Sequence, residues 1–228
     1  MQVVILAWWL GTRLRPITES IPKPMVEINS KPFLYYQLQM IKKYWFKDIL
    51  LLVWYLWEKV EIYFWNWDEF WLNIKYNYEK ELLWTWWALK LAQNKLEKDF
   101  ILIYGDSYLD FDYNLLIDFW IKNNYNLALT AYNNQENTDV LNNLEVKNWK
   151  VLQYKKWIKD KKLNYVEAWV LFVKKEILNN IEDNKIISLE EAIFPKLIAD
   201  KKLWAYIVNE KFYDIWTFER LNIFKNLS

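Results

Sequence analysis

Residues 3–16 read VVILAWWLGTRLRP, and this stretch decides how the rest of the chain is interpreted. Val3–Ala7 is a short, continuous apolar run rich in β-branched side chains, typical of a strand buried on both faces. The following residues change to a turn that contains Gly11 and two arginines. We expect this turn at the carboxyl end of the strand, which is where open α/β sheets bind their ligands.

The rest of the chain alternates between apolar runs and segments with helical periodicity. Strands are predicted at residues 48–53, 73–78, 100–104, 127–132 and 165–173, with a hairpin over 143–151. Helices are predicted at 33–41, 58–64, 88–96, 114–122 and 188–199. Ser30 would cap the first helix, with Pro32 in its first turn, and Ser188 with Glu191 forms a capping box before the last.

This order of elements predicts an α/β fold with a Rossmann-like, mixed and mainly parallel sheet flanked by helices. No linker, repeat or low-complexity segment interrupts the pattern. Residues 1–228 are therefore expected to form a single domain.

Composition excludes several classes of function. The chain has 30 Lys and Arg against 29 Asp and Glu, and this balance argues against a nucleic-acid partner. It has no His and no Cys, which excludes Ser-His-Asp triads, the common zinc sites, Cys nucleophiles and disulfides. No basic leader and no apolar run of membrane-spanning length occurs, so we expect a cytoplasmic protein without a membrane partner. A homo-oligomer is compatible with these features.

The tryptophan and glycine contents are abnormal: 17 Trp against 2 Gly. Average usage of about 7% would give a chain of this length about 16 glycines. Tryptophan also stands in sequence contexts that favour glycine, such as the turn-like Asn148-Trp149-Lys150. We hypothesise that most of these tryptophans come from UGA codons that the source organism reads as glycine.

Several motifs resemble those of the sugar-1-phosphate nucleotidyltransferases, and the resemblance covers nearly the whole chain. Besides residues 6–16, the motifs are IPKPM (21–25), KPFL (31–34), ELLWTWWA (81–88), GDS (105–107), EAWV (167–170) and FYDIWT (212–217). Seven tryptophans stand where the family has glycine: Trp8, Trp9, Trp84, Trp86, Trp87, Trp169 and Trp216. This coincidence supports the decoding hypothesis. Among relatives, the chain looks most like the short heptose- and mannose-1-phosphate guanylyltransferases, which lack a further carboxy-terminal domain.

The resemblance implies a nucleotide site around the turn after the first strand and around segment 81–88. The nucleotide-binding residues would be Leu6, Ala7, Trp8, Trp9, Gly11, Thr12, Arg13, Glu81, Trp84, Thr85 and Gly105. Arg13 and Lys23 would neutralise phosphate charge, and with Asp106 they would be the catalytic residues.

The resemblance also implies a metal site and a sugar-phosphate site. Asp106 and Asp214 would hold Mg²⁺ from opposite sides, and this ion prefers a few carboxylates together with phosphates and water. Lys156 would bind the sugar phosphate, with Lys155 as an alternative because the register there is loose. Glu167 and Trp169 would complete the sugar site.

The expected reaction joins an NTP and a sugar 1-phosphate into an NDP-sugar, by in-line attack on the α-phosphorus and release of pyrophosphate. Such a transfer depends on positioning and charge neutralisation more than on acid–base catalysis, so a chain without His can carry it out. Guanylyl transfer is favoured, and thymidylyl, uridylyl and cytidylyl transfer stay open. If the tryptophans are real, indole rings would fill the triphosphate site. The alternative is then a catalytically inactive protein of the same fold that binds a sugar or a nucleotide-sugar.

Overall fold

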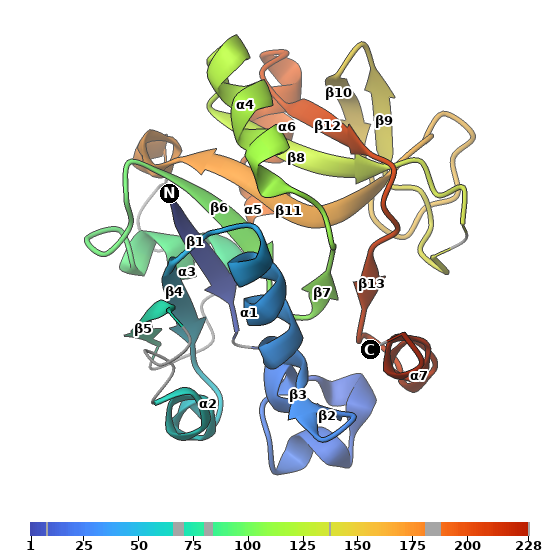
Figure 1. Ribbon diagram of the computed structural model, residues 1–228. Coiled ribbons are helices and arrows are strands. Elements are labelled where there is room, and N and C mark those ends of the chain that lie inside the picture. Colours follow the sequence, from blue (N-terminus) through green and yellow to red (C-terminus); the bar gives the residue numbers. More distant parts are fainter. Residues whose placement is uncertain (8, 66–70, 80–83, 137, 181–187, 228) are drawn as a thin grey trace.

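The computed structural model describes residues 1–7, 9–65, 71–79, 84–136, 138–180 and 188–227 (Figure 1). Nine described strands form the central sheet: β1 (Gln2–Leu6), β4 (Asp48–Val53), β5 (Asn73–Tyr78), β6 (Asp99–Tyr104), β8 (Leu127–Tyr132), β9 (Leu144–Lys147), β10 (Lys150–Tyr154), β11 (Val166–Lys174) and β12 (Trp204–Val208). Four short strands lie outside it: β2 (Glu27–Ile28), β3 (Lys31–Pro32), β7 (Ser107–Tyr108) and β13 (Tyr213–Asp214).

The strand order in the sheet is β5-β4-β1-β6-β11-β8-β12-β10-β9. β5, β4, β1 and β6 are parallel to one another, as β12 is to β8. β11 is antiparallel to β6 and β8, and β10 is antiparallel to β12 and β9. The predicted α/β class with a mixed sheet is confirmed.

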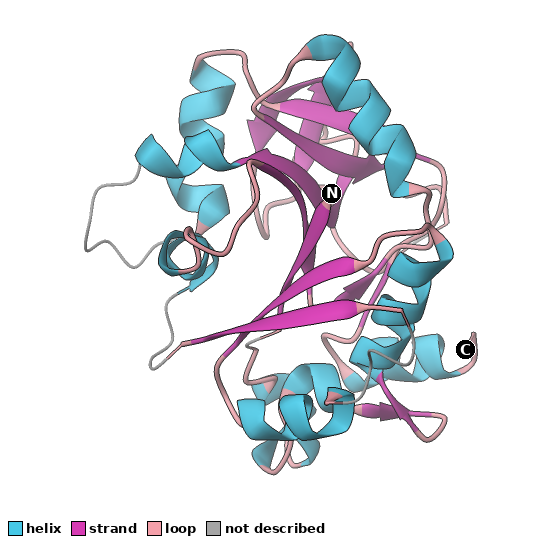
Figure 2. Cartoon of the chain, turned by 60° about the vertical axis from the view of Figure 1, so that its left-hand side comes forward, coloured by secondary structure: helices cyan, strands magenta, loops and turns pink. Residues whose placement is uncertain are grey.

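Helices cover both faces of this sheet (Figure 2). They are α1 (Phe33–Lys43), α2 (Trp57–Phe64), α3 (Trp84–Leu91), α4 (Tyr113–Asn123), α5 (Leu189–Ala192), α6 (Phe194–Ala199) and α7 (Phe218–Lys225). Side chains of α1, α2 and α4 share one buried cluster with Val3 and Ile5, whereas α3, α5 and α6 share a second with Val4 and Leu6. β1 is therefore buried on both faces, as its unbroken apolar run predicts. None of the helices in the described part of the chain is long and apolar enough to cross a bilayer.

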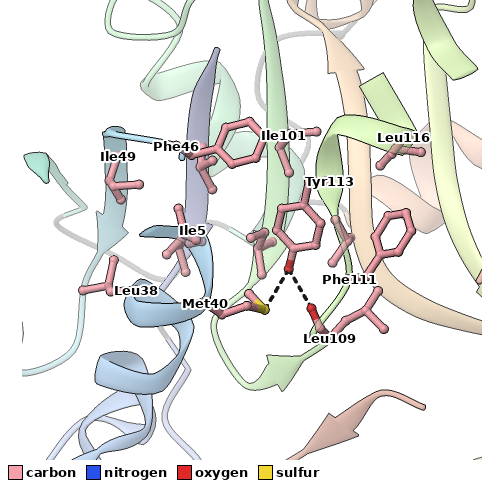
Figure 3. Close-up of a cluster of buried hydrophobic side chains, with 14 of the residues drawn as sticks. Ile5, Leu38, Met40, Phe46, Ile49, Ile101, Leu109, Phe111, Tyr113 and Leu116 are labelled. Atoms are coloured by element: carbon pink, nitrogen blue, oxygen red, sulfur yellow. Dashed lines mark hydrogen bonds between the residues drawn. The ribbon is translucent and has the colours of Figure 1, made fainter. Parts of the chain in front are cut away.

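The segment that follows β6 is fixed against α1. The Tyr113 hydroxyl donates a hydrogen bond to the Leu109 carbonyl at 3.1 Å and contacts Met40 Sδ at 3.4 Å (Figure 3). Gln37 on α1 donates to the carbonyls of Tyr104 and Ser107. These bonds hold the backbone on either side of Asp106.

A third buried cluster joins the two ends of the chain. It contains Leu14, Val26, Ile28, Phe33, Ile215, Leu221 and Phe224. β13 pairs with β7, and this pairing sets Asp214 opposite Ser107. Residues about a hundred positions apart are thus brought together in a separate two-stranded sheet.

Three predicted boundaries are wrong. Ser30 does not cap α1, because the helix begins after Pro32, which is its N-cap residue and belongs to β3. α3 ends at Leu91 and is followed by turns instead of continuing to residue 96. The region 188–199 is two short helices, because Ile193 interrupts it just before Phe194 and Pro195. The predicted Ser188 cap is confirmed, since its side chain accepts a hydrogen bond from the Glu191 amide.

Candidate functional site

A pocket of about 300 Å³ lies at the carboxyl ends of the central strands. Its walls come from β11, α5, β13 and α7, from the segments that follow β1, β6 and β10, and from residues 139–143. Sequence-predicted residues on its walls are Trp9, Asp106, Lys156, Trp169 and Asp214. The volume matches the lower end of the range for small-ligand sites.

Asp106 and Lys23 form a buried ion pair in this site. Lys23 Nζ lies 2.6 Å from Asp106 Oδ2, and both side chains are about 95% buried. Burial lowers the pKa of Lys23 below its ordinary value, and the Asp106 carboxylate only partly opposes this effect. The pair sets a positive charge directly beside the carboxylate expected to bind metal.

Asp214 is held by the beginning of α7. Its Oδ1 accepts a hydrogen bond from the Trp216 amide at 2.9 Å, and its Oδ2 accepts one from Arg220 Nη1 at 2.8 Å. Burial raises the pKa of Asp214 above its ordinary value, against the lowering effect of Arg220. Arg220 also donates to the Asp139 carbonyl and lines the pocket. It was not predicted, although Thr217 as an N-cap would have placed it in the first turn of a helix beside Asp214.

The carboxylate pair suits Mg²⁺. Asp106 and Asp214 line one pocket and interact electrostatically. Within the described residues no cluster of three or more metal-ligating side chains occurs. Two carboxylates suffice for an ion that takes its other ligands from phosphate and water.

The turn after β1 packs closely on the site. Gly11 has the left-handed φ of +64°, and a Cβ there would lie 2.9 Å from Thr18 and 3.1 Å from Lys23. A Cβ at Gly105 would collide with the Leu6 carbonyl oxygen, which accepts the Gly105 amide hydrogen bond. The chain's two glycines therefore lie where a side chain has no room.

The other predicted nucleotide residues are distributed as follows. Leu6 and Ala7 are buried, and Thr12 and Arg13 are exposed, with the Arg13 guanidinium 4.4 Å from the centre of the Trp216 ring. Thr85 does not line the pocket; its hydroxyl oxygen accepts the Leu189 amide hydrogen bond and holds the start of α5. Trp8, Glu81 and the side chain of Trp84 lie outside the described residues.

Some of the residues predicted to bind the sugar phosphate line the pocket, and others do not. Lys156 lines the pocket and lies 3.2 Å from Glu190 Oε1, whereas Lys155 pairs with Asp160 at 2.9 Å outside it. The structure therefore favours Lys156 over Lys155. Glu167 is fully buried and does not line the pocket; the Tyr154 hydroxyl donates to its Oε2 at 2.9 Å. Burial and the nearby Glu190 carboxylate raise the pKa of Glu167 to about 8.

Glu190 was missed by the sequence analysis. It lines the pocket, is 4% exposed and accepts a hydrogen bond from the Tyr104 hydroxyl at 2.8 Å. Glu191 stands beside it with the same chemistry, so the sequence alone does not show which carboxylate faces the site. The packing of α5 against α3 and α6 decides this.

Four tryptophans among the described residues line the pocket. Trp157 and Trp216 stack at 5.1 Å between ring centres, and both line the pocket with Trp9 and Trp169. Trp169 lies in β11, with its ring 5.2 Å from that of Tyr104. These rings line the same pocket as the carboxylate pair and Lys156.

The fold and the site together define an α/β protein with acidic and basic side chains gathered in one pocket at the carboxyl ends of its strands. The chain belongs to the nucleotidyl transferase family, whose model matches residues 2–140. It is 41% identical over 117 residues to the D-glycero-alpha-D-manno-heptose 1-phosphate guanylyltransferase of Campylobacter jejuni, covering 51% of this chain and 52% of that protein. It is 28% identical to the protein of the same description from Aneurinibacillus thermoaerophilus, covering 94% and 93%.

A solved structure agrees with this assignment. HddC from Yersinia pseudotuberculosis, complexed with GMP-PN, superposes with a TM-score of 0.85 at 25% identity and covers 99% of this chain and 98% of that one. The chain spans 52% to 61% of the length of the first curated relatives it matches. Similar proteins include sugar-phosphate guanylyltransferases and a uridylyltransferase.

Proposed function

We propose that this chain transfers a nucleotidyl group, most readily guanylyl, from an NTP to a sugar 1-phosphate. The observation that carries the proposal is the arrangement of one pocket. Asp106, Asp214, Arg220, Lys156 and Glu190 line it, and Lys23, which does not line it, is paired with Asp106. Acidic groups for a metal and basic groups for phosphates are thus combined in one site of ligand size.

The chemistry requires no acid–base residue. A phosphate oxygen of the sugar 1-phosphate attacks the α-phosphorus, and a new P–O bond forms. The bond between the α-phosphorus and the bridging oxygen breaks, and pyrophosphate leaves with that electron pair. Lys23 and Arg13 offset the negative charge of the triphosphate, and Lys156 holds the phosphate of the acceptor.

Asp106 and Asp214 would hold Mg²⁺, which supplies neutralisation of the triphosphate when bound. Lys23 keeps Asp106 oriented through the 2.6 Å pair, and Arg220 does the same for Asp214. Both carboxylates are therefore positioned before a nucleotide arrives, which reduces the ordering that binding requires.

Guanylyl transfer is preferred because the two heptose 1-phosphate relatives described above are guanylyltransferases and the HddC structure is complexed with GMP-PN. The acceptor proposed on the same ground is a heptose or mannose 1-phosphate. A uridylyltransferase is also similar in sequence, at 26% identity, so the base is tested directly.

The test is a pyrophosphate-release assay that pairs GTP, ATP, UTP, CTP and dTTP with a panel of sugar 1-phosphates. We would assay two proteins: the printed chain and a glycine form, in which the seven tryptophans at family glycine positions are glycine. Asp106→Asn should abolish release, whereas Lys155→Met, outside the pocket, should keep it within about twofold.

We expect the glycine form to release pyrophosphate from GTP and a mannose-type sugar 1-phosphate. The Asp106→Asn variant of that form should release none. A folded glycine form that releases no pyrophosphate from any pair would overturn the proposal. Binding of NDP-sugars without turnover would instead support the inactive sugar-binding alternative.

A further inference from the structure

Glu190 has a carboxylate oxygen that no described residue satisfies. Its Oε1 receives the Tyr104 hydroxyl and the Lys156 ammonium, while Oε2 is buried without a hydrogen-bond partner in the described chain. Buried carboxylate oxygens are almost always paired, so an unpaired one on a pocket wall indicates a missing donor. Nothing in the nucleotide chemistry proposed above uses this oxygen.

The surroundings of Glu190 restrict what that donor can be. Lys156 lies 3.2 Å away and disfavours a cationic group, while it attracts an anionic one. Glu167 and Tyr154 interact electrostatically with Glu190 and add buried acceptor oxygens and a further hydroxyl near it. A ligand with neutral hydroxyl donors next to a phosphate fits this combination of charges.

We propose that Glu190 binds the acceptor sugar, with its free carboxylate oxygen accepting a hydrogen bond from a ring hydroxyl while Lys156 faces the phosphate. This inference rests on the proposed function and adds a residue that selects among sugar 1-phosphates. Tyr104 and Lys156 both hold Oε1, so the carboxylate and its unpaired Oε2 keep a fixed position on a residue that lines the pocket.

The test is steady-state kinetics with the sugar 1-phosphate that gives the highest turnover. Glu190→Gln removes the charge that strengthens the hydrogen bond, and we expect the KM for the sugar 1-phosphate to rise about tenfold. The KM for the NTP and kcat should stay within about twofold. Glu191→Gln is the matched control, because its side chain does not line the pocket and its helix position is adjacent.

A set of monodeoxy analogues of that sugar 1-phosphate identifies the hydroxyl. One analogue should raise the KM of the unchanged enzyme about tenfold and have no further effect on Glu190→Gln. An active enzyme in which Glu190→Gln leaves the sugar KM unchanged, or in which every analogue is additive with it, overturns this inference alone. Absence of turnover with every pair overturns the proposed function instead.

A second, independent observation concerns the backbone at tryptophan. Five described tryptophans adopt the left-handed conformation, with φ between 62° and 68°: Trp45, Trp71, Trp149, Trp157 and Trp169. Bulky residues rarely occur there, because the Cβ approaches the following carbonyl oxygen. Glycine is the residue that adopts this conformation without strain.

Trp45 occupies the position after the C-cap of α1. The Phe46 amide donates to the Ile41 carbonyl, and the Trp45 amide donates to the Lys42 carbonyl. These two bonds define a Schellman motif, in which the left-handed residue is usually glycine. The local fold therefore specifies glycine where the sequence has Trp45.

The geometry of the strands favours glycine at two further tryptophan positions. Asn148 and Trp149 form the two-residue loop between β9 and β10, both with positive φ, as in a type I′ turn, for which Asn-Gly is a favoured pair. Trp169 lies where the register of β11 against β8 shifts between Glu167 and Leu171. A bulge with a left-handed residue of this kind takes glycine.

We infer that the protein made in its source cells carries glycine at these five positions. Four of them, Trp45, Trp71, Trp149 and Trp157, lie outside the family motifs, so the backbone supports the decoding hypothesis without the resemblance. Glycine at Trp157 and Trp169 would also remove two rings from the pocket and widen the approach to Lys156.

The test is peptide mass spectrometry of the protein purified from its source cells, covering residues 44–47 and 144–155. Glycine lowers the mass of each peptide by about 129 Da per replaced tryptophan, the difference between the two side chains. The codons of the gene give a second readout, and we expect UGA at all five positions. Tryptophan in either peptide, or UGG codons at these positions, overturns the inference.

Discussion

The conformation of Trp45 allows a direct test of backbone strain. In the printed chain its φ is 68° and its side chain is 85% exposed. Left-handed strain costs a non-glycine residue about 1–2 kcal/mol. Glycine costs about 0.5–1 kcal/mol because the unfolded chain gains freedom. The Trp45 ring is 85% exposed in the folded chain, and unfolded chains also bury part of each side chain. Replacing this ring therefore loses almost no apolar burial. Trp45→Gly should therefore stabilise the printed chain by about 0.5–1 kcal/mol.

Trp65→Gly is the matched control. Trp65 is 71% exposed and follows α2, but its φ of −53° is right-handed. Glycine there brings the same entropic cost and relieves no strain, so it should destabilise by about 0.5–1 kcal/mol. Urea denaturation of both variants should show a difference of about 1–2 kcal/mol, or roughly 2–8 °C in Tm for this size. Equal losses, or a larger loss for Trp45→Gly, would refute the argument from strain.

Three further predictions concern the site. Arg220→Met leaves the Asp214 carboxylate buried without its cation and should cost about 2–3 kcal/mol in urea denaturation, less than for a fully buried pair because Arg220 is 17% exposed; an unchanged midpoint would contradict this. Glu167 has its pKa raised to about 8, so its neutral form stabilises the fold and that contribution falls as pH rises from about 4.5 through 8. Glu167→Gln should therefore lose less stability than the unchanged chain between pH 6 and 9, and parallel profiles would count against the assignment. Thr85→Val leaves the Leu189 amide without its acceptor and should cost about 1–3 kcal/mol, with hydrogen exchange at α5 as the local readout; unchanged protection there would show that this bond does not hold the helix.

The parts of the fold that follow from local pattern were predictable. The unbroken apolar runs of β1 and β6 and their spacing give neighbouring parallel strands, whose carboxyl ends hold Gly11 and Asp106. Helix boundaries were less predictable because they depend on packing. Pro32 belongs to a two-stranded sheet before α1, and this pairing outweighs the capping preference of Ser30.

The residues of the site also fall into those that the sequence identified and those that it did not. The resemblance identified Asp106, Asp214 and Lys156, and all three line one pocket. Arg220 could have been found from the Thr217 cap, which places it in the first helical turn beside Asp214, whereas Glu190 became visible only through tertiary packing, because its partner Tyr104 is distant in sequence. Charge patterns along the chain carry no information about such contacts.

The two kinds of glycine position in this chain are constrained by different physics. Gly11 and Gly105 lie where a Cβ would meet neighbouring atoms, so replacing either would disturb the packing around β1 and the site. Trp45 and Trp71 have left-handed backbones but are at least 75% exposed, so a side chain fits there and the backbone alone carries the strain. Exchange of tryptophan for glycine at these outer positions should therefore change stability with little rearrangement. At Trp157 and Trp169 the same exchange also changes the pocket, so it should alter substrate access and stability together.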